Sequence, residues 1–170
     1  MFKRYLYIFL SGIFSIILLF SSLFDSSNYL GSSSLSFPIH SYYTISSEFG
    51  YRNLDSYHFH NGIDIPAVSG TLIYPISYGT VTNIGFSNSY GNYVIISYTN
   101  GYKSLYGHIS SKLSVSCGDY VSPTSAVCTV GPKYLSSGKL NGFTTGPHLH
   151  FTLYKDGSLI DPQTVNFNLV

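Results

Sequence analysis

Two histidines separated by one residue, His148 and His150, are the first candidates for chemistry in this sequence. They follow a Gly-Pro turn and lead into a β-branched and aromatic run, residues 151–154, which predicts a strand. Because strand side chains repeat every two residues, both imidazoles are expected on one face, with their Cα atoms about 7 Å apart, while Leu149 points into a core. One imidazole can then bind a metal ion while the other contacts a substrate or a metal-bound water.

By itself, an H-x-H pair also fits a structural or exposed position, so a second group of residues has to support the metal hypothesis. His60 and Asp64 are joined by an Asn-Gly turn, and Asp64 lies between two isoleucines in a short predicted strand. A carboxylate in an apolar strand is costly to bury unless it is paired or coordinates a metal. With His150, these residues offer two imidazoles and one carboxylate, and three such ligands with a fourth position left to water describe a catalytic zinc site. The alternative for the H-x-x-x-D spacing alone is a turn-capping Asp near an exposed His.

Short β segments must position these side chains, because no stretch after the N-terminal region shows a sustained helical period. Each segment is rich in β-branched and aromatic residues and is bounded by Gly, Asn or Pro. The dipeptides Asn100-Gly101 and Asp156-Gly157 each separate two such runs and predict hairpins. The sequence therefore predicts an all-β, antiparallel domain. The predicted strands are residues 70–76, 79–86, 92–98, 101–106 and 148–154.

The N-terminus predicts a targeting or membrane segment. Residues 5–24 carry no charge and follow two basic residues, and twenty such residues can cross a hydrocarbon core of about 30 Å as a helix. The basic flank keeps this end in the cytoplasm and exports the remainder. We expect residues 1–24 to be an uncleaved signal anchor, so that the protein contacts the membrane through residues 5–24; a cleaved signal peptide is the alternative.

Length and composition bound the rest of the chain. Residues 25–36 are Ser-rich and without periodicity, which predicts a linker, and residues 37–170 suffice for one domain. Only 9% of the 170 residues are charged, and the net charge is +1. The sequence lacks the basic footprint that nucleic acid requires as a partner. Cys117 and Cys128 can pair in an oxidising compartment or can both be small buried side chains, and the sequence leaves both alternatives open.

A further histidine, His108, follows the second strand of the Asn-Gly hairpin. Together with the groups above it completes a pattern that resembles zinc endopeptidases of the lysostaphin/LytM type, peptidase family M23. The resemblance covers about residues 37–162, and several independent motifs agree in order and approximate spacing. The motifs are SSEFGYR (46–52), HNGIDIP (60–66), YGNYVIISY (90–98), YGHIS (106–110) and TTGPHLHF (144–151).

The resemblance implies one Zn²⁺ per chain, bound by His60, Asp64 and His150. It implies that His108 and His148 act on the water or on the developing oxyanion, without deciding which is the general base. It also implies a compact antiparallel β domain with a groove over the metal. Because the chain has only seven acidic residues, the outward ring nitrogens of the ligand histidines are expected to bond to backbone carbonyls or Tyr hydroxyls.

Family substrates are the peptide stems and cross-bridges of bacterial peptidoglycan, which suits an exported domain. The resemblance therefore implies a membrane-anchored zinc endopeptidase with an extracytoplasmic catalytic domain. The alternative is a non-catalytic LytM-like module that binds cell wall or a partner protein in division or sporulation. Such relatives typically lose metal ligands, whereas all five matched positions are filled here. A β domain that binds another metal for storage or sensing is a third reading.

Four features depart from the family pattern. Tyr98 stands where many relatives carry a histidine. The accessory contact that this histidine makes with substrate is therefore missing here or is made by the phenol of Tyr98. Residues 132–141 form a longer loop than usual, which bears on specificity. His58 shares a strand face with the ligand two residues later and is interpreted as a groove-wall or solvent-facing residue. His40 has no partner in the sequence and is expected at the surface.

Overall fold

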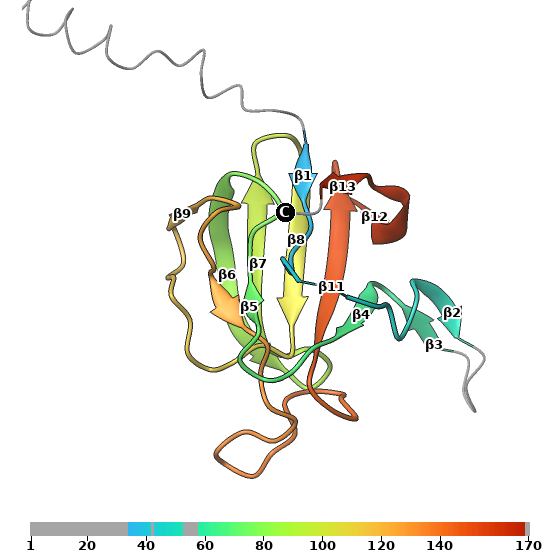
Figure 1. Cartoon of the computed structure of the whole chain (residues 1–170), viewed down its shortest axis with the longest axis vertical. Coiled ribbons are helices and arrows are strands. Elements are labelled where there is room, and N and C mark those ends of the chain that lie inside the picture. Colours follow the sequence, from blue (N-terminus) through green and yellow to red (C-terminus); the bar gives the residue numbers. More distant parts are fainter. Residues whose placement is uncertain (1–33, 42, 53–57, 169–170) are drawn as a thin grey trace, which may run out of the picture. The chain divides into compact units, whose positions relative to one another are not determined.

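Strands and connecting loops make up almost all of the computed structural model, which describes residues 34–41, 43–52 and 58–168 (Figure 1). Within these ranges one short 3-10 helix occurs, η2 (Pro162–Thr164), so the all-β prediction is confirmed for the domain. The predicted membrane or signal helix, residues 5–24, lies outside the described residues. In the part of the chain that is described, no helix is long and apolar enough to cross a membrane.

A curled sheet of seven strands forms the frame of the domain (Figure 1). All of its pairings are antiparallel, in the order β12-β11-β8-β7-β6-β9, and β4 pairs with the first half of β11, on the edge that β12 occupies further along. The sheet strands are β4 (Ile63–Pro66), β6 (Gly79–Ser87), β7 (Gly91–Tyr98), β8 (Tyr102–Gly107), β9 (Tyr120–Val121), β11 (His148–Lys155) and β12 (Ser158–Ile160).

Three two-stranded pairs complete the architecture. One of them is parallel, so the antiparallel prediction holds for every other pair of strands in the described residues. The parallel pair starts at Leu35, which is buried and lies inside the segment predicted as a linker. The pairs are β1 (Leu35–Ser36) with β13 (Phe167–Asn168), β5 (Leu72–Ile73) with β10 (Cys128–Thr129), and β2 (Gly50–Arg52) with β3 (His58–His60).

Both predicted hairpins are present. Asn100-Gly101 joins β7 to β8, and Gly101 has φ 80°, the positive value that tight hairpin turns require. Asp156 and Gly157 join β11 to β12 with φ 49° and 83°. The predicted strand 70–76 is shortened to β5, because Pro75 has no N–H for a ladder.

The core lies on the concave side of the sheet, where alternate strand residues are buried. Ile63 and Ile65 of β4 are buried there, and Leu149 and Phe151 of β11 pair with them in register. Gly62 precedes β4 at a point where a Cβ atom would collide with the Phe151 carbonyl. The absence of a side chain therefore lets the chain approach β11 closely enough for Asp64 to pair with His150.

The two cysteines are free thiols in the structure, so the disulfide alternative is wrong. Cys128 lies on β10 and is buried among apolar side chains, and this burial raises the pKa of its thiol well above the usual value. Cys117 is exposed, and its thiol is 3.3 Å from the Thr82 carbonyl. The alternative of two buried thiols therefore describes only Cys128.

Candidate metal centre

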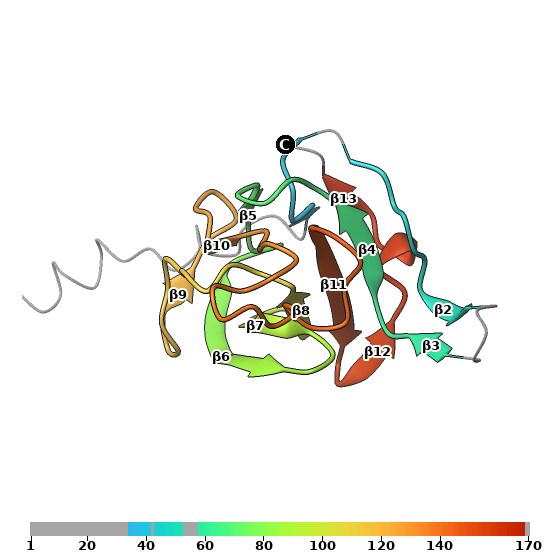
Figure 2. The ribbon, with the colours of Figure 1, turned by 90° about the horizontal axis from the view of Figure 1, so that it is seen from below.

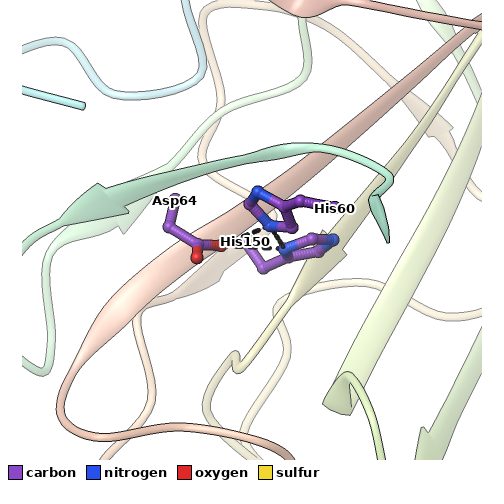
Figure 3. A group of neighbouring side chains, drawn as sticks. All are labelled: His60, Asp64 and His150. Atoms are coloured by element: carbon purple, nitrogen blue, oxygen red, sulfur yellow. Dashed lines mark hydrogen bonds and ion pairs between the residues drawn. The ribbon is translucent and has the colours of Figure 1, made fainter. Parts of the chain in front are cut away.

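Three side chains from three strands converge at one end of the sheet: His60 from β3, Asp64 from β4 and His150 from β11 (Figure 3). Nε2 of His60 lies 3.1 Å from Oδ1 of Asp64 and 3.1 Å from Nδ1 of His150. Nδ1 of His150 lies 2.9 Å from the same carboxylate oxygen. The sequence hypothesis grouped these residues, and the register of β4 on β11 brings two of them together.

The donor set fits a divalent metal ion. Four tetrahedral ligands at about 2.0–2.1 Å from zinc are about 3.3 Å apart, close to the separations of the three atoms. Nδ1–H of His60 donates to the Glu48 carbonyl at 2.8 Å, which leaves Nε2 with its lone pair. Oγ1 of Thr152 lies 3.0 Å from Nε2 of His150, where it can accept that ring's N–H and leave Nδ1 with its lone pair. Two lone pairs and a carboxylate oxygen facing one point form a donor set that suits a cation.

Burial and neighbouring groups keep this donor set in the form that binds metals. Burial alone would raise the pKa of Asp64, but the adjoining rings of His150 and His60 outweigh burial and hold that pKa far below its usual range. Burial lowers the pKa of His150, so this ring is neutral at physiological pH. Nη1 of Arg52 lies 3.9 Å from Oδ2 of Asp64 and adds a positive charge beside the carboxylate.

His148 stands beside the three ligands with one ring nitrogen directed toward them. Its Nδ1–H donates to the Gly146 carbonyl at 2.9 Å, and Oγ1 of Thr144 is 3.3 Å from the same nitrogen. Its Nε2 is 3.6 Å from Oδ1 of Asp64. His148 is therefore oriented by the turn that precedes β11.

His108 closes the other side of the site. Its ring centroid is 4.5 Å from that of His148 and 6.0 Å from that of His150. Its Nδ1–H donates to the Asn141 carbonyl at 2.6 Å. Burial lowers the pKa of His108 to about 4, so the ring is neutral at physiological pH, with its lone pair on Nε2. The backbone at this residue is left-handed, with φ 56°, an uncommon value for a non-glycine residue.

The arrangement brings all five sequence-predicted residues into one cluster: three that can hold a metal and two imidazoles beside them that can accept or return a proton. The outward nitrogens bond to backbone carbonyls, as expected, and to the Thr152 hydroxyl; no Tyr hydroxyl takes this role among the described residues.

The structure also describes the three single residues among the departures from the family pattern. The Tyr98 hydroxyl is buried against Ser104 and Tyr106, so the phenol does not provide a substrate contact. His40 is half-buried and stacked on Tyr74, which differs from the surface prediction. The backbone of His58 pairs with Arg52, while its side chain lies outside the described part of the structure.

Sequence reasoning missed several supporting residues. The ring of Tyr90 is tilted against that of His150, with 5.3 Å between the ring centroids, and its hydroxyl accepts a hydrogen bond from the Asn61 amide. The carbonyl oxygen of Tyr90 accepts a hydrogen bond from the backbone N–H of His108 at 2.6 Å. Asn141 contacts His108, and Arg52 contacts Asp64. Tyr90 and Arg52 lie inside the family motifs, so the motifs are the sequence signal that could have identified them. Asn141 lies outside all of them.

Comparison with known proteins identifies the family of this chain. Residues 58–162 match the family described as Peptidase family M23. The chain is 36% identical over 127 residues to the DD-carboxypeptidase/endopeptidase Mpg of Neisseria meningitidis serogroup B, and 34% identical over 134 residues to the peptidoglycan DD-endopeptidase ShyA of Vibrio cholerae. The alignments cover 73% and 76% of this chain but only 27% and 29% of those proteins.

Among solved structures, a zinc-containing peptidase from Vibrio cholerae superposes with a TM-score of 0.66 at 25% identity. The superposition covers 79% of this chain and 41% of that one. The chain therefore spans less than half of the length of each of these three proteins.

Proposed function

Because the chain belongs to peptidase family M23, we propose that it is a zinc-dependent endopeptidase that hydrolyses peptide bonds in bacterial cell-wall peptidoglycan. The observation that carries the proposal is the convergence of His60, Asp64 and His150, whose three donor atoms lie within 3.1 Å of one another. The names of two relatives, peptidoglycan DD-endopeptidase and DD-carboxypeptidase/endopeptidase, support the substrate class.

His60, Asp64 and His150 would hold the ion through Nε2, Oδ1 and Nδ1, which are the atoms that converge. When bound, zinc lowers the pKa of a water from 15.7 to about 7 and polarises a carbonyl group. Zinc suits two imidazoles and one carboxylate, and three protein ligands leave a position open for the reaction.

The two remaining histidines handle protons. Nε2 of His148 and Nε2 of His108 carry lone pairs, because Nδ1–H of each ring is committed to a backbone carbonyl. Each can therefore accept a proton from the attacking water, and once protonated each can donate to the oxyanion or to the leaving amine. The two ring centroids are 4.5 Å apart, so both imidazoles lie on the same side of the ligands.

Metal analysis and digestion of peptidoglycan by the purified full-length chain test the proposal. Replacing His60, Asp64 or His150 by Ala removes one of three protein ligands, so each variant should lose both zinc and hydrolysis. His148→Ala should keep one zinc per chain, while hydrolysis falls by about 10²–10⁴.

The matched control is His40→Gln, which removes a histidine that makes no contact with the cluster in the described structure. This variant should retain both zinc and hydrolysis. If the wild-type protein binds zinc but releases no peptide fragments, it is a non-catalytic module that binds cell wall or a partner. If His148→Ala loses zinc while His150→Ala keeps it, the roles of these two histidines are reversed.

A further inference from the structure

We propose that Asn141 is a positioning residue of the site: its side chain fastens the end of the 132–141 loop to the sheet, and so holds its own carbonyl group against Nδ1 of His108. The inference rests on the proposed function, since it concerns how one of the two proton-handling histidines is held. It also gives the long loop a part in the reaction and not only in specificity.

Asn141 is fully buried, and every polar atom of the residue is bonded. Its Oδ1 accepts from the backbone N–H of Asn92 on β7 at 2.9 Å. Its Nδ2 donates to the carbonyl of Ile109 at 3.1 Å, and its backbone N–H donates to the backbone carbonyl of Lys133 at 2.9 Å. Its backbone oxygen accepts from His108 at 2.6 Å. Asn141 therefore links β7, the residue after His108 and the start of its own loop.

The surroundings are shaped for this side chain. A Cβ atom at Gly91 would collide with the Asn141 carbonyl and Oδ1, and one at Gly131 would collide with Nδ2 and with the Ile109 carbonyl. Both glycines thus leave room for an amide that reaches two backbone groups at once. Figures 1 and 2 both place residues 131–147, drawn in orange, beyond the ends of β7 and β8, where His108 follows β8.

The bond to His108 decides which of its ring nitrogens can act. A carbonyl oxygen only accepts, so Nδ1 of His108 carries the proton and Nε2 keeps the lone pair. In the other tautomer Nε2 would be a donor and could not take a proton from water. His148 obtains its carbonyl partner from Gly146, two residues away on the same turn. His108 depends on a residue 33 positions away, so a loop must be folded correctly before this ring is oriented.

Asn141→Ala in the full-length chain tests the proposal through three readouts: kcat and KM on purified peptidoglycan, zinc per chain, and the tautomer of His108 from nitrogen-15 NMR of labelled histidines. His108→Asn identifies the resonance. We expect kcat to fall about tenfold or more with KM changed less than about twofold, zinc to stay at one per chain, and the Nδ1–H signal to give way to a mixture of tautomers.

Tyr98→Phe is the matched control, because it removes a different buried hydrogen-bonding group, whose partners are Ser104 and Tyr106 and not His108. It should lower the melting temperature while leaving kcat and the tautomer unchanged. Should Asn141→Ala fail to fold, the smaller truncation Asn141→Ser supplies the same readouts.

An unchanged tautomer and kcat in the Asn141 variant would overturn the proposal. If the variant loses both its zinc and its kcat, the proposal is also overturned, since Asn141 would then stabilise the whole metal centre and not the orientation of His108 alone. If the wild-type chain hydrolyses nothing, the proposed function fails, but the tautomer of His108 still decides whether Asn141 positions the ring.

Discussion

At the scale of single residues, the ring nitrogens that face away from the metal centre decide what its histidines can do. Three of the four bond to backbone carbonyls, which accept hydrogen bonds and never donate them. A carbonyl therefore fixes a tautomer without adding a charge, whereas a carboxylate would also raise the proton affinity of the ring. The pairs are His60 with Glu48, His108 with Asn141, His148 with Gly146 and, through a hydroxyl, His150 with Thr152.

The lowered pKa of His108 predicts a pH dependence of stability. The unfolded ring takes up a proton below about pH 6.5, while the folded ring, whose pKa burial lowers to about 4, does not. The unfolded state therefore binds more protons between these values, so stability falls as the pH is lowered through this window, by on the order of 3 kcal/mol for this residue.

Denaturant unfolding at several pH values between 7 and 4, with chelator present throughout, measures this effect. His108→Asn is the matched variant, because it removes the titrating ring while asparagine tolerates the left-handed backbone at φ 56°. The variant should lose less stability than the wild type as the pH falls. Identical slopes for the two proteins would contradict the prediction.

At the scale of elements, β11 organises the site. It carries His148 and His150 and pairs on one edge with β8, which leads to His108, and on the other with β4, which carries Asp64. A shift of one residue in the pairing with β4 would turn Asp64 to the opposite face. The close approach at Gly62 is therefore part of the metal centre, although this glycine has no group that binds metal.

Gly62→Ala tests this link between packing and metal binding. The added methyl group would collide with the Phe151 backbone, which cannot yield as a flexible side chain would, so we expect a loss of about 1–3 kcal/mol in stability and weaker zinc binding. Thermal unfolding and zinc titration measure both. Gly146→Ala, whose new methyl group would meet open space, should change neither. Wild-type zinc affinity in Gly62→Ala would show that β4 keeps its register by other means.

The sequence predicts those elements whose signal is local. Two-residue turns at 100–101 and 156–157 and the alternation of side chains around Val94 and Ile96 are read directly from the chain, and both hairpins are present. The pairing of β1 with β13 joins residues more than 130 positions apart, and no local pattern specifies it. Asn141 was missed for the same reason, because its bonds reach Asn92 and Ile109 across the chain.

At the scale of the whole molecule, we propose that the domain acts outside the cytoplasm, held at the membrane by residues 5–24. Full-length protein should then fractionate with membranes and resist extraction by salt or high pH. A variant with a cleavable signal peptide in place of residues 1–24 should be released in soluble form. A wild-type protein found only as a soluble form beginning near Ser34 would show that the native segment is cleaved.

The parallel pairing of β1 with β13 has a practical consequence. Leu35 lies opposite Phe167, and the Phe37 N–H donates to the Asn168 carbonyl, so the chain enters and leaves the described domain through adjacent strands, about 5 Å apart. A domain with such neighbouring ends can be inserted into a surface loop of a host protein without forcing the loop open. Residues 34–168 therefore suit use as a cassette carried by an unrelated scaffold, with short glycine linkers at either junction.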